Sequence, residues 1–169
     1  MISYPQQDTI QLSKAARRQV YQAGNSIQGF ARHFVGVTLY PYQREAANAI
    51  IKSVYDRYGK TFVLIFSRQS GKDDILAIIF LFLMSRYIEW SIDIVCAQPT
   101  FKPQTINAME RLRKRGVLFG RRLTRTAGYI MRLGQSRTSY FSAEPTASQV
   151  GATADRLLVM NEAQDIDPA

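Results

Sequence analysis

Apolar and polar positions follow helical spacing in some segments and extended spacing in others. Small and aliphatic side chains recur every three or four residues over 41–58, which predicts an amphipathic helix with Pro41 in its first turn. Residues 61–66 (TFVLIF) form a continuous apolar run, which predicts a strand covered on both faces. A polar loop, residues 67–72, then leads into an apolar helix over 73–89.

The rest of the chain continues this alternation of strands and helices. The other predicted elements are a strand at 91–97, a basic helix at 105–115, a hairpin of 129–133 with 138–142, and a strand at 156–160. Alternating apolar strands and helices predict an α/β fold with a mainly parallel central sheet. We expect a helical lead-in over residues 1–38 and an α/β core over residues 39–169.

Composition narrows the class of protein. The longest apolar run, residues 75–84, is shorter than the ~18 residues that indicate a membrane span, so no membrane partner is expected. The single cysteine, Cys96, cannot form an intrachain disulfide, which favours an intracellular protein.

The charge is strongly positive and unevenly distributed. The formal net charge is +9, and between Lys102 and Arg137 the only acidic residue is Glu110. Clustered cations favour a nucleic-acid partner, although a solvated helix face is the simpler explanation for part of the cluster. The candidate DNA or partner contacts are Arg111, Arg113, Lys114, Arg115, Arg121, Arg122 and Arg125.

The loop of residues 67–72 (SRQSGK) carries the first candidate chemistry. A glycine and a lysine between a strand and a helix suit a phosphate site, where backbone amides, an ammonium group and a helix N-terminus meet the anion. The usual phosphate-loop pattern is incomplete, because Phe66 occupies its first glycine position and Asp73 its hydroxyl position.

Two further segments complete the pattern. The apolar strand at 156–160 ends at Asn161 and Glu162, where a Walker B site carries a metal-side acid and an acid that activates water. Asn161 has no charge, so we expect weaker Mg²⁺ binding. Upstream, Tyr42 could stack on an adenine base whose edge the Gln43 amide could read.

These motifs, in this order, resemble the large subunit of viral (phage) terminases. Arg68 and Gln69 before Gly-Lys resemble that family's variant Walker A motif, and residues 161–164 (NEAQ) resemble its Asp-Glu-Ala-Gln. The resemblance covers residues 39–167. It implies a P-loop NTPase (RecA/ASCE-like) three-layer fold that hydrolyses ATP with Mg²⁺ to move double-stranded DNA into a capsid.

The resemblance also implies a role for each matching position. Glu162 and Arg68 would be catalytic, and Asp73 and Asn161 would lie beside the metal. The implied nucleotide-binding residues are Tyr42, Gln43, Ser67, Arg68, Gln69, Ser70, Gly71, Lys72 and Asp73.

The implied setting is the host cytoplasm, with a homo-oligomeric ring, the portal and the small terminase subunit as partners. We expect the ATPase core to be truncated just after the Walker B strand and the nuclease domain to be absent. Two alternatives remain open: a helicase-like ATPase, and a degenerate, non-catalytic module that binds DNA or assists assembly.

Overall fold

A computed structural model gives the fold. It describes residues 22–87, 92–98, 104–116, 122–126, 129–143 and 154–163. The helical elements are α2 (Ile27–Phe30), the π-helix η1 (Ala31–Val35), α3 (Pro41–Tyr55), α4 (Lys72–Arg86) and α5 (Gln104–Arg115). The strands are β1 (Asp93–Gln98), β2 (Leu123–Thr126), β3 (Ile130–Leu133), β4 (Ser136–Ser142) and β5 (Leu157–Met160).

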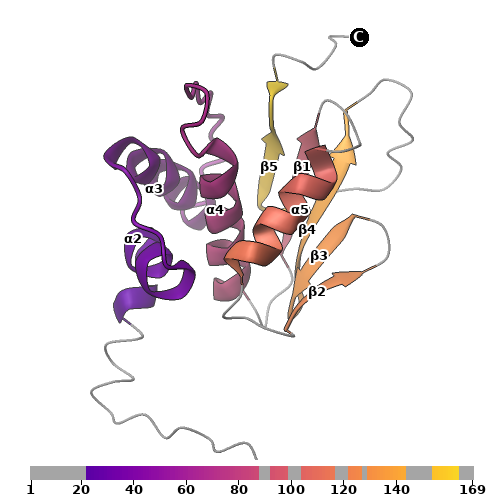
Figure 1. Ribbon diagram of the computed structural model, residues 1–169, viewed down its shortest axis with the longest axis horizontal. Coiled ribbons are helices and arrows are strands. Elements are labelled where there is room, and N and C mark those ends of the chain that lie inside the picture. The colour runs from indigo at the N-terminus through magenta and orange to yellow at the C-terminus, as the bar shows by residue number, and fades with distance from the viewer. Residues whose placement is uncertain are drawn as a thin grey trace, which may run out of the picture.

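The five strands form one open sheet in the order β2-β3-β4-β1-β5 (Figure 1). β1 pairs in parallel with both β4 and β5, whereas β3 pairs antiparallel with both β2 and β4. The α/β class is therefore confirmed, but the prediction of a mainly parallel sheet is wrong. The sheet is mixed because the tight turn at Gly134 forces β3 and β4 into antiparallel pairing, and β2 extends that meander.

The strand predicted at residues 61–66 is also wrong. These residues form an irregular segment in which Val63 is 83% and Ile65 94% exposed, while Phe66 is partly buried against the core. An apolar composition favours a strand only where a neighbouring strand supplies hydrogen bonds. Within the described part of the chain, residues 61–66 pair with no strand.

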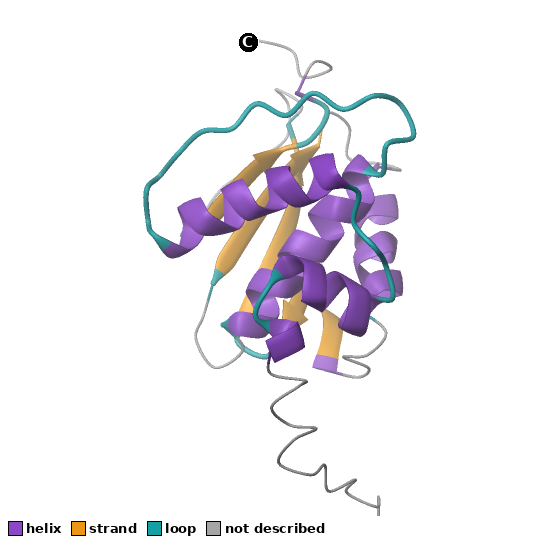
Figure 2. Ribbon diagram, turned by 90° about the vertical axis from the view of Figure 1, so that its left-hand side faces the viewer, coloured by secondary structure: helices purple, strands orange, loops and turns teal. Residues whose placement is uncertain are grey.

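The helices pack together on one another and on the sheet (Figures 1 and 2). α4 lies between α3 and α5, and α5 also contacts β4. Nine of the fifteen residues of α4 are buried, so its apolar side chains point in every direction, as expected of a central helix. Among the described residues, no helix combines the length and apolar composition needed to cross a bilayer.

The remaining elements follow the sequence prediction with shifted ends. The helices expected at 41–58 and 73–89 are seen as α3 and α4, and the basic helix is α5. The strands expected at 91–97 and 156–160 are β1 and β5, and the hairpin is β3–β4. Residues 1–21 of the expected helical lead-in lie outside the described residues; the rest contains α2 and η1.

Candidate functional site

The loop before α4 has a defined backbone geometry. The Ser70 amide donates a hydrogen bond to the Ser67 carbonyl at 3.3 Å, which closes a turn. Gly71 follows as the N-cap of α4 with φ +77°, a left-handed conformation that glycine adopts without a steric penalty. Gln69 is also left-handed, with φ +60°, although it carries a side chain. A left-handed residue with a side chain persists only where the surrounding structure holds the backbone in place.

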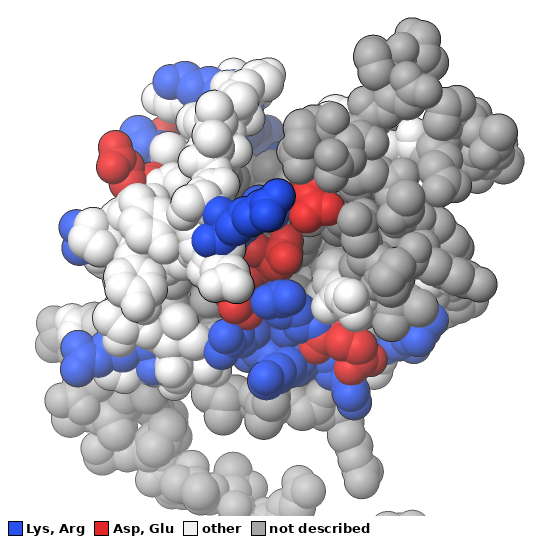
Figure 3. All heavy atoms as spheres, turned by 45° about the horizontal axis from the view of Figure 1, so that its top comes forward, with Lys and Arg blue, Asp and Glu red and all other residues white. Residues whose placement is uncertain are grey.

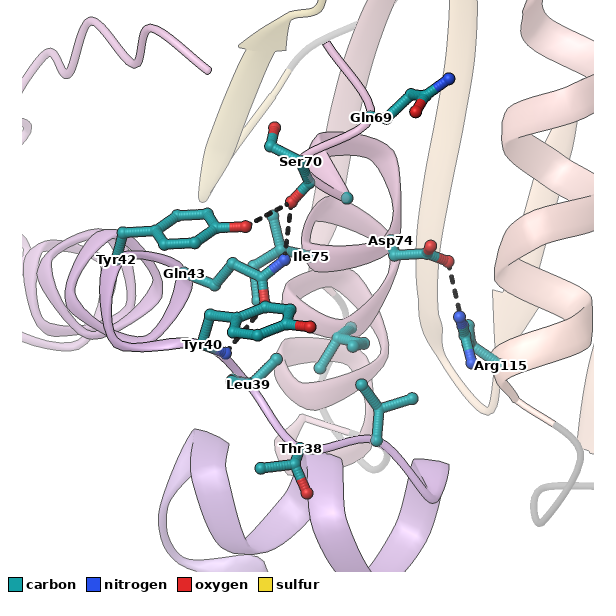
Figure 4. Close-up of a pocket in the computed structure, with 13 residues that line it drawn as sticks. Thr38, Leu39, Tyr40, Tyr42, Gln43, Gln69, Ser70, Asp74, Ile75 and Arg115 are labelled. Carbon is teal, nitrogen blue, oxygen red and sulfur yellow. Dashed lines mark hydrogen bonds and ion pairs between the residues drawn. The ribbon is translucent and has the colours of Figure 1, made fainter. Parts of the chain in front are cut away.

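Two side chains at the start of α3 hold this loop against the helix, an arrangement called the clamp below (Figure 4). The Ser70 carbonyl accepts hydrogen bonds from the Tyr42 hydroxyl at 2.9 Å and from Gln43 Nε2 at 2.8 Å. The Gln43 Oε1 accepts from the Tyr40 amide at 3.1 Å, which caps α3. Both ends of the Gln43 amide are therefore engaged with backbone. The sequence assigned Gln43 to adenine, whereas here it ties α3 to the loop.

The clamp also explains the glycine at position 71. A Cβ placed on Gly71 would lie 2.8 Å from Gln43 Nε2. The buried Gln43 side chain could not stay in place beside it. Gly71 is thus required twice, by its backbone conformation and by the close approach of Gln43.

Lys72 and Glu162, separated by 90 positions, meet at the same end of the molecule. Lys72 Nζ lies 3.4 Å from Glu162 Oε1, and both side chains are about 30% exposed. β5 runs parallel to β1 and delivers Glu162 at its carboxyl end, next to the first turn of α4. Glu162 is left-handed, with φ +56°. An ammonium group and a carboxylate thus face each other across the start of the helix.

The two residues expected beside a metal also touch. Asn161 is 8% exposed, and its Nδ2 donates to Asp73 Oδ1 at 3.2 Å. The Asn161 backbone amide donates to the Ala97 carbonyl at 3.0 Å, so β1 holds the end of β5 in position. Across the described ranges, no three His, Cys, Asp or Glu side chains form a group that could hold a metal ion by themselves.

Part of the basic cluster on α5 turns toward this site. Arg111 and Arg115 contact the carboxylate of Asp74, at 3.4 Å and 3.0 Å. Arg113 instead pairs with Glu110 on the same helix at 2.7 Å. Figure 3 shows acidic and basic side chains side by side on the face it presents, rather than one uninterrupted basic surface.

The other candidate DNA contacts that the structure describes lie in α5 and in or next to β2. Lys114, Arg122 and Arg125 are exposed, and the Arg125 guanidinium lies 5.9 Å from the centre of the Tyr129 ring. Arg121 lies outside the described residues. The six described residues of this predicted group therefore lie in different surroundings.

No family model, curated protein or solved structure matches this chain. Its function has to be argued from the arrangement of its own residues.

A cavity of about 190 Å³ lies between α3, the loop and the start of α4. Typical ligand pockets measure roughly 300–1,000 Å³, so this cavity is large enough for only part of a nucleotide. At its rim the rings of Tyr40 and Tyr42 are stacked, with centroids 5.8 Å apart, and both remain partly exposed.

Two features of the site were missed by sequence reasoning: the Tyr40 ring in the stack and the Asp74 carboxylate that receives two arginines. Ser70 was predicted at the site, and its hydroxyl is buried. Ser70 Oγ has no hydrogen-bond partner among the residues that the structure describes. Leaving such a group unpaired costs about 1–3 kcal/mol. Acids after Gly-Lys, followed by arginines at helical spacing, were the signal for Asp74.

Proposed function

We propose that this chain binds ATP on the loop of residues 67–72 and hydrolyses it, as the ATPase part of a terminase large subunit. The meeting of Lys72 and Glu162 at 3.4 Å supports the proposal most directly. Two segments far apart in sequence bring together the groups that phosphoryl transfer to water needs: a cation for the phosphates and a carboxylate for the attacking water.

The phosphates would enter between these two groups. Lys72 Nζ pairs with the Glu162 carboxylate, and a triphosphate would replace that carboxylate as its partner. The Ser70 hydroxyl and the free amides at the start of α4 supply further donors, favoured by the helix dipole. Arg68 is exposed on the same loop, from which it could reach the outer phosphate.

Glu162, once released, would accept a hydrogen bond from water and orient it for in-line attack. Its carboxylate is about 30% exposed, so water can reach it. The left-handed backbone at Glu162 sets the direction of the side chain relative to Lys72. Positioning and charge stabilisation account for most of the rate enhancement in this class of reaction.

The residues present fit Mg²⁺ as a partner of the nucleotide. Asp73 Oδ1 and the Asn161 amide lie together, and protein sites for Mg²⁺ use one or two oxygen ligands with phosphates and water completing the shell. Mg²⁺ would neutralise charge on the phosphates. A neutral amide in place of a carboxylate makes this a weaker site than one with two acids.

The base would lie against the stacked Tyr40 and Tyr42 rings at the rim of the cavity. Exposed aromatic faces give a base a stacking surface, and the cavity behind them offers partial enclosure. Gln43 would then contribute to nucleotide binding by holding the loop in place. Adenine could hydrogen-bond to the Gln43 amide only by displacing the Tyr40 amide or the Ser70 carbonyl.

Double-stranded DNA remains the proposed substrate of the motor. The net charge of +9 and the exposed cations Lys114, Arg122 and Arg125 support it. A P-loop (RecA/ASCE-like) fold is part of the same proposal, supported by the loop-to-helix geometry at Lys72 and by the parallel pairing of β5 with β1. The ring, the portal and the small subunit follow from the same resemblance.

ATP titration and an ATPase assay on the whole chain test the proposal. Lys72→Ala should abolish ATP binding, whereas Glu162→Gln should retain binding and lose hydrolysis, because only the proposed roles differ. Lys52→Ala is the control, since Lys52 is an exposed cation on α3 that pairs with Asp56. Equal ATP affinities for the unsubstituted chain and Lys72→Ala would refute the site.

The same measurements separate the alternative functions. Absence of ATP binding together with salt-dependent DNA binding would favour the non-catalytic module, which the Asn161–Asp73 contact and the positive charge also suit. ATP hydrolysis stimulated by single-stranded DNA rather than double-stranded DNA would favour the helicase-like ATPase.

A further inference from the structure

The first turn of α4 holds two adjacent carboxylates whose four oxygens are all engaged. Asp73 Oδ1 accepts from Asn161 Nδ2 at 3.2 Å, and Asp74 Oδ1 accepts from Arg115 Nε at 3.0 Å. The two remaining oxygens face one guanidinium. Arg111 Nη1 lies 3.4 Å from Asp74 Oδ2, and Arg111 Nη2 lies 3.9 Å from Asp73 Oδ2.

Arg111 reaches both carboxylates because of its place on α5. Arg111 and Arg115 are four residues apart on one helix, so they share the face that packs against α4. Figure 4 shows Arg115 extending from α5 toward Asp74. The planar guanidinium carries two terminal nitrogens, which lets one arginine face two carboxylates.

The charges of the six paired groups at the start of α4 balance. Lys72, Arg111 and Arg115 give +3, and Asp73, Asp74 and Glu162 give −3, so the six interacting groups sum to zero. Without Arg111, two carboxylates beside Lys72 would share one arginine. Negative potential would then rise where a polyphosphate must bind.

We propose that Arg111 is a positioning residue of the phosphate site: it offsets the charge of Asp73 and Asp74 and holds the Asp73 carboxylate in place before Mg²⁺ and nucleotide arrive. This inference rests on the proposed ATP function. It predicts two linked effects of losing Arg111. ATP without Mg²⁺ meets more negative potential, whereas Mg²⁺ finds a freed Asp73 oxygen.

The test is ATP titration of the full chain with Mg²⁺ and with EDTA. In Arg111→Gln, ATP affinity in EDTA should fall roughly fivefold, the scale of one unit charge at the edge of a partly solvated site. ATP affinity with Mg²⁺ should fall less than ATP affinity in EDTA. The ratio of the affinity with Mg²⁺ to the affinity in EDTA therefore increases in Arg111→Gln. A purely structural role would lower both affinities by the same factor and leave the ratio unchanged.

Two further variants keep the test informative if Arg111→Gln is poorly folded. Arg111→Lys keeps the charge, so its ATP affinity in EDTA should stay within about twofold of the unsubstituted chain. Adding Asp74→Asn to Arg111→Gln removes the uncompensated charge and should restore affinity in EDTA. Arg57→Gln is the matched control, since Arg57 is exposed beyond the far end of α3, a helix about 22 Å long.

The outcomes distinguish this inference from the function it rests on. Suppose that the unsubstituted chain binds ATP and that Arg111→Gln has the same ratio of ATP affinity with Mg²⁺ to ATP affinity in EDTA as the unsubstituted chain. The positioning role is then overturned, and the ATP site stands. A loss in Arg111→Lys as large as in Arg111→Gln would also overturn the charge argument. If the unsubstituted chain binds ATP under neither condition, both proposals fail together.

Discussion

Replacing Gly71 by alanine tests the clamp between α3 and the phosphate loop. Alanine at φ +77° costs about 1 kcal/mol in backbone strain. Its Cβ would also lie 2.8 Å from Gln43 Nε2 and displace that amide from the Ser70 carbonyl. Leaving the buried Gln43 amide unpaired costs about 1–3 kcal/mol. Gly71→Ala should therefore lose about 2–4 kcal/mol in free energy of unfolding.

Gly36 provides the matched control. Its backbone angles, φ +74° and ψ +27°, are nearly those of Gly71, φ +77° and ψ +25°. A Cβ on Gly36 meets nothing within 4 Å among the described atoms. Gly36→Ala should thus lose only the ~1 kcal/mol of backbone strain. Any gain from stiffening the unfolded chain is common to both variants and cancels in the comparison.

The assay is urea unfolding followed by far-ultraviolet circular dichroism, with both variants compared at the same slope. Truncating the clamp by Gln43→Ala in the Gly71→Ala background should cost less than the two single losses added together, because the clash is then absent. Equal losses for Gly71→Ala and Gly36→Ala would show that Gln43 does not approach the loop, and the clamp would have to be abandoned.

Three further outcomes follow from the same structure. Gln69→Gly relieves a left-handed backbone and should stabilise the fold by about 1 kcal/mol in urea unfolding, whereas Gln69→Ala should not. Burial raises the pKa of Tyr140 well above 10.0, so above pH 10 the tyrosine ionises in the unfolded chain first. Its contribution to the free energy of unfolding should hold below pH 10 and fall above it by about 1.4 kcal/mol per pH unit. This decline should be reduced in Tyr140→Phe but not in Tyr58→Phe, since Tyr58 is exposed. Asn161→Asp adds a carboxylate beside Asp73 and should tighten Mg²⁺-dependent ATP binding; an unchanged Mg²⁺ requirement in titration would argue against a metal there.

Local pattern was sufficient for most elements of the fold. α3 and α4 could be predicted because apolar spacing, Pro41 and the acids after Lys72 all agree on where each helix lies. The turn at Gly134 made the β3–β4 hairpin predictable. Strand direction across the sheet was not, because it depends on which neighbours meet in space rather than on any local signal.

Residues 61–66 also show that local sequence does not determine strand pairing. Their composition is typical of a buried strand, yet Val63 and Ile65 face solvent. Burial and pairing depend on the rest of the sheet, which the segment itself does not encode.

The sequence predicted which residues lie at the candidate site better than it predicted which contacts they make. Gly71, Lys72 and Glu162 were chosen for their chemistry, and Lys72 and Glu162 do meet. The use of Gln43 as a clamp was not foreseen, because an amide that suits adenine equally suits a backbone carbonyl and amide. Likewise, Arg111 and Arg115 looked like part of a DNA surface until the packing of α5 on α4 brought them to Asp74.

The uncovered run at residues 61–66 bears on how the protein behaves in solution. Six uncharged, β-forming residues without proline are the kind of segment that stacks between chains into cross-β assemblies. Lys60 precedes the run directly and Arg68 follows it after Ser67, positions where flanking charges oppose such stacking. Repulsion between these cations on neighbouring chains opposes such stacking, and raising the ionic strength weakens that repulsion by screening it.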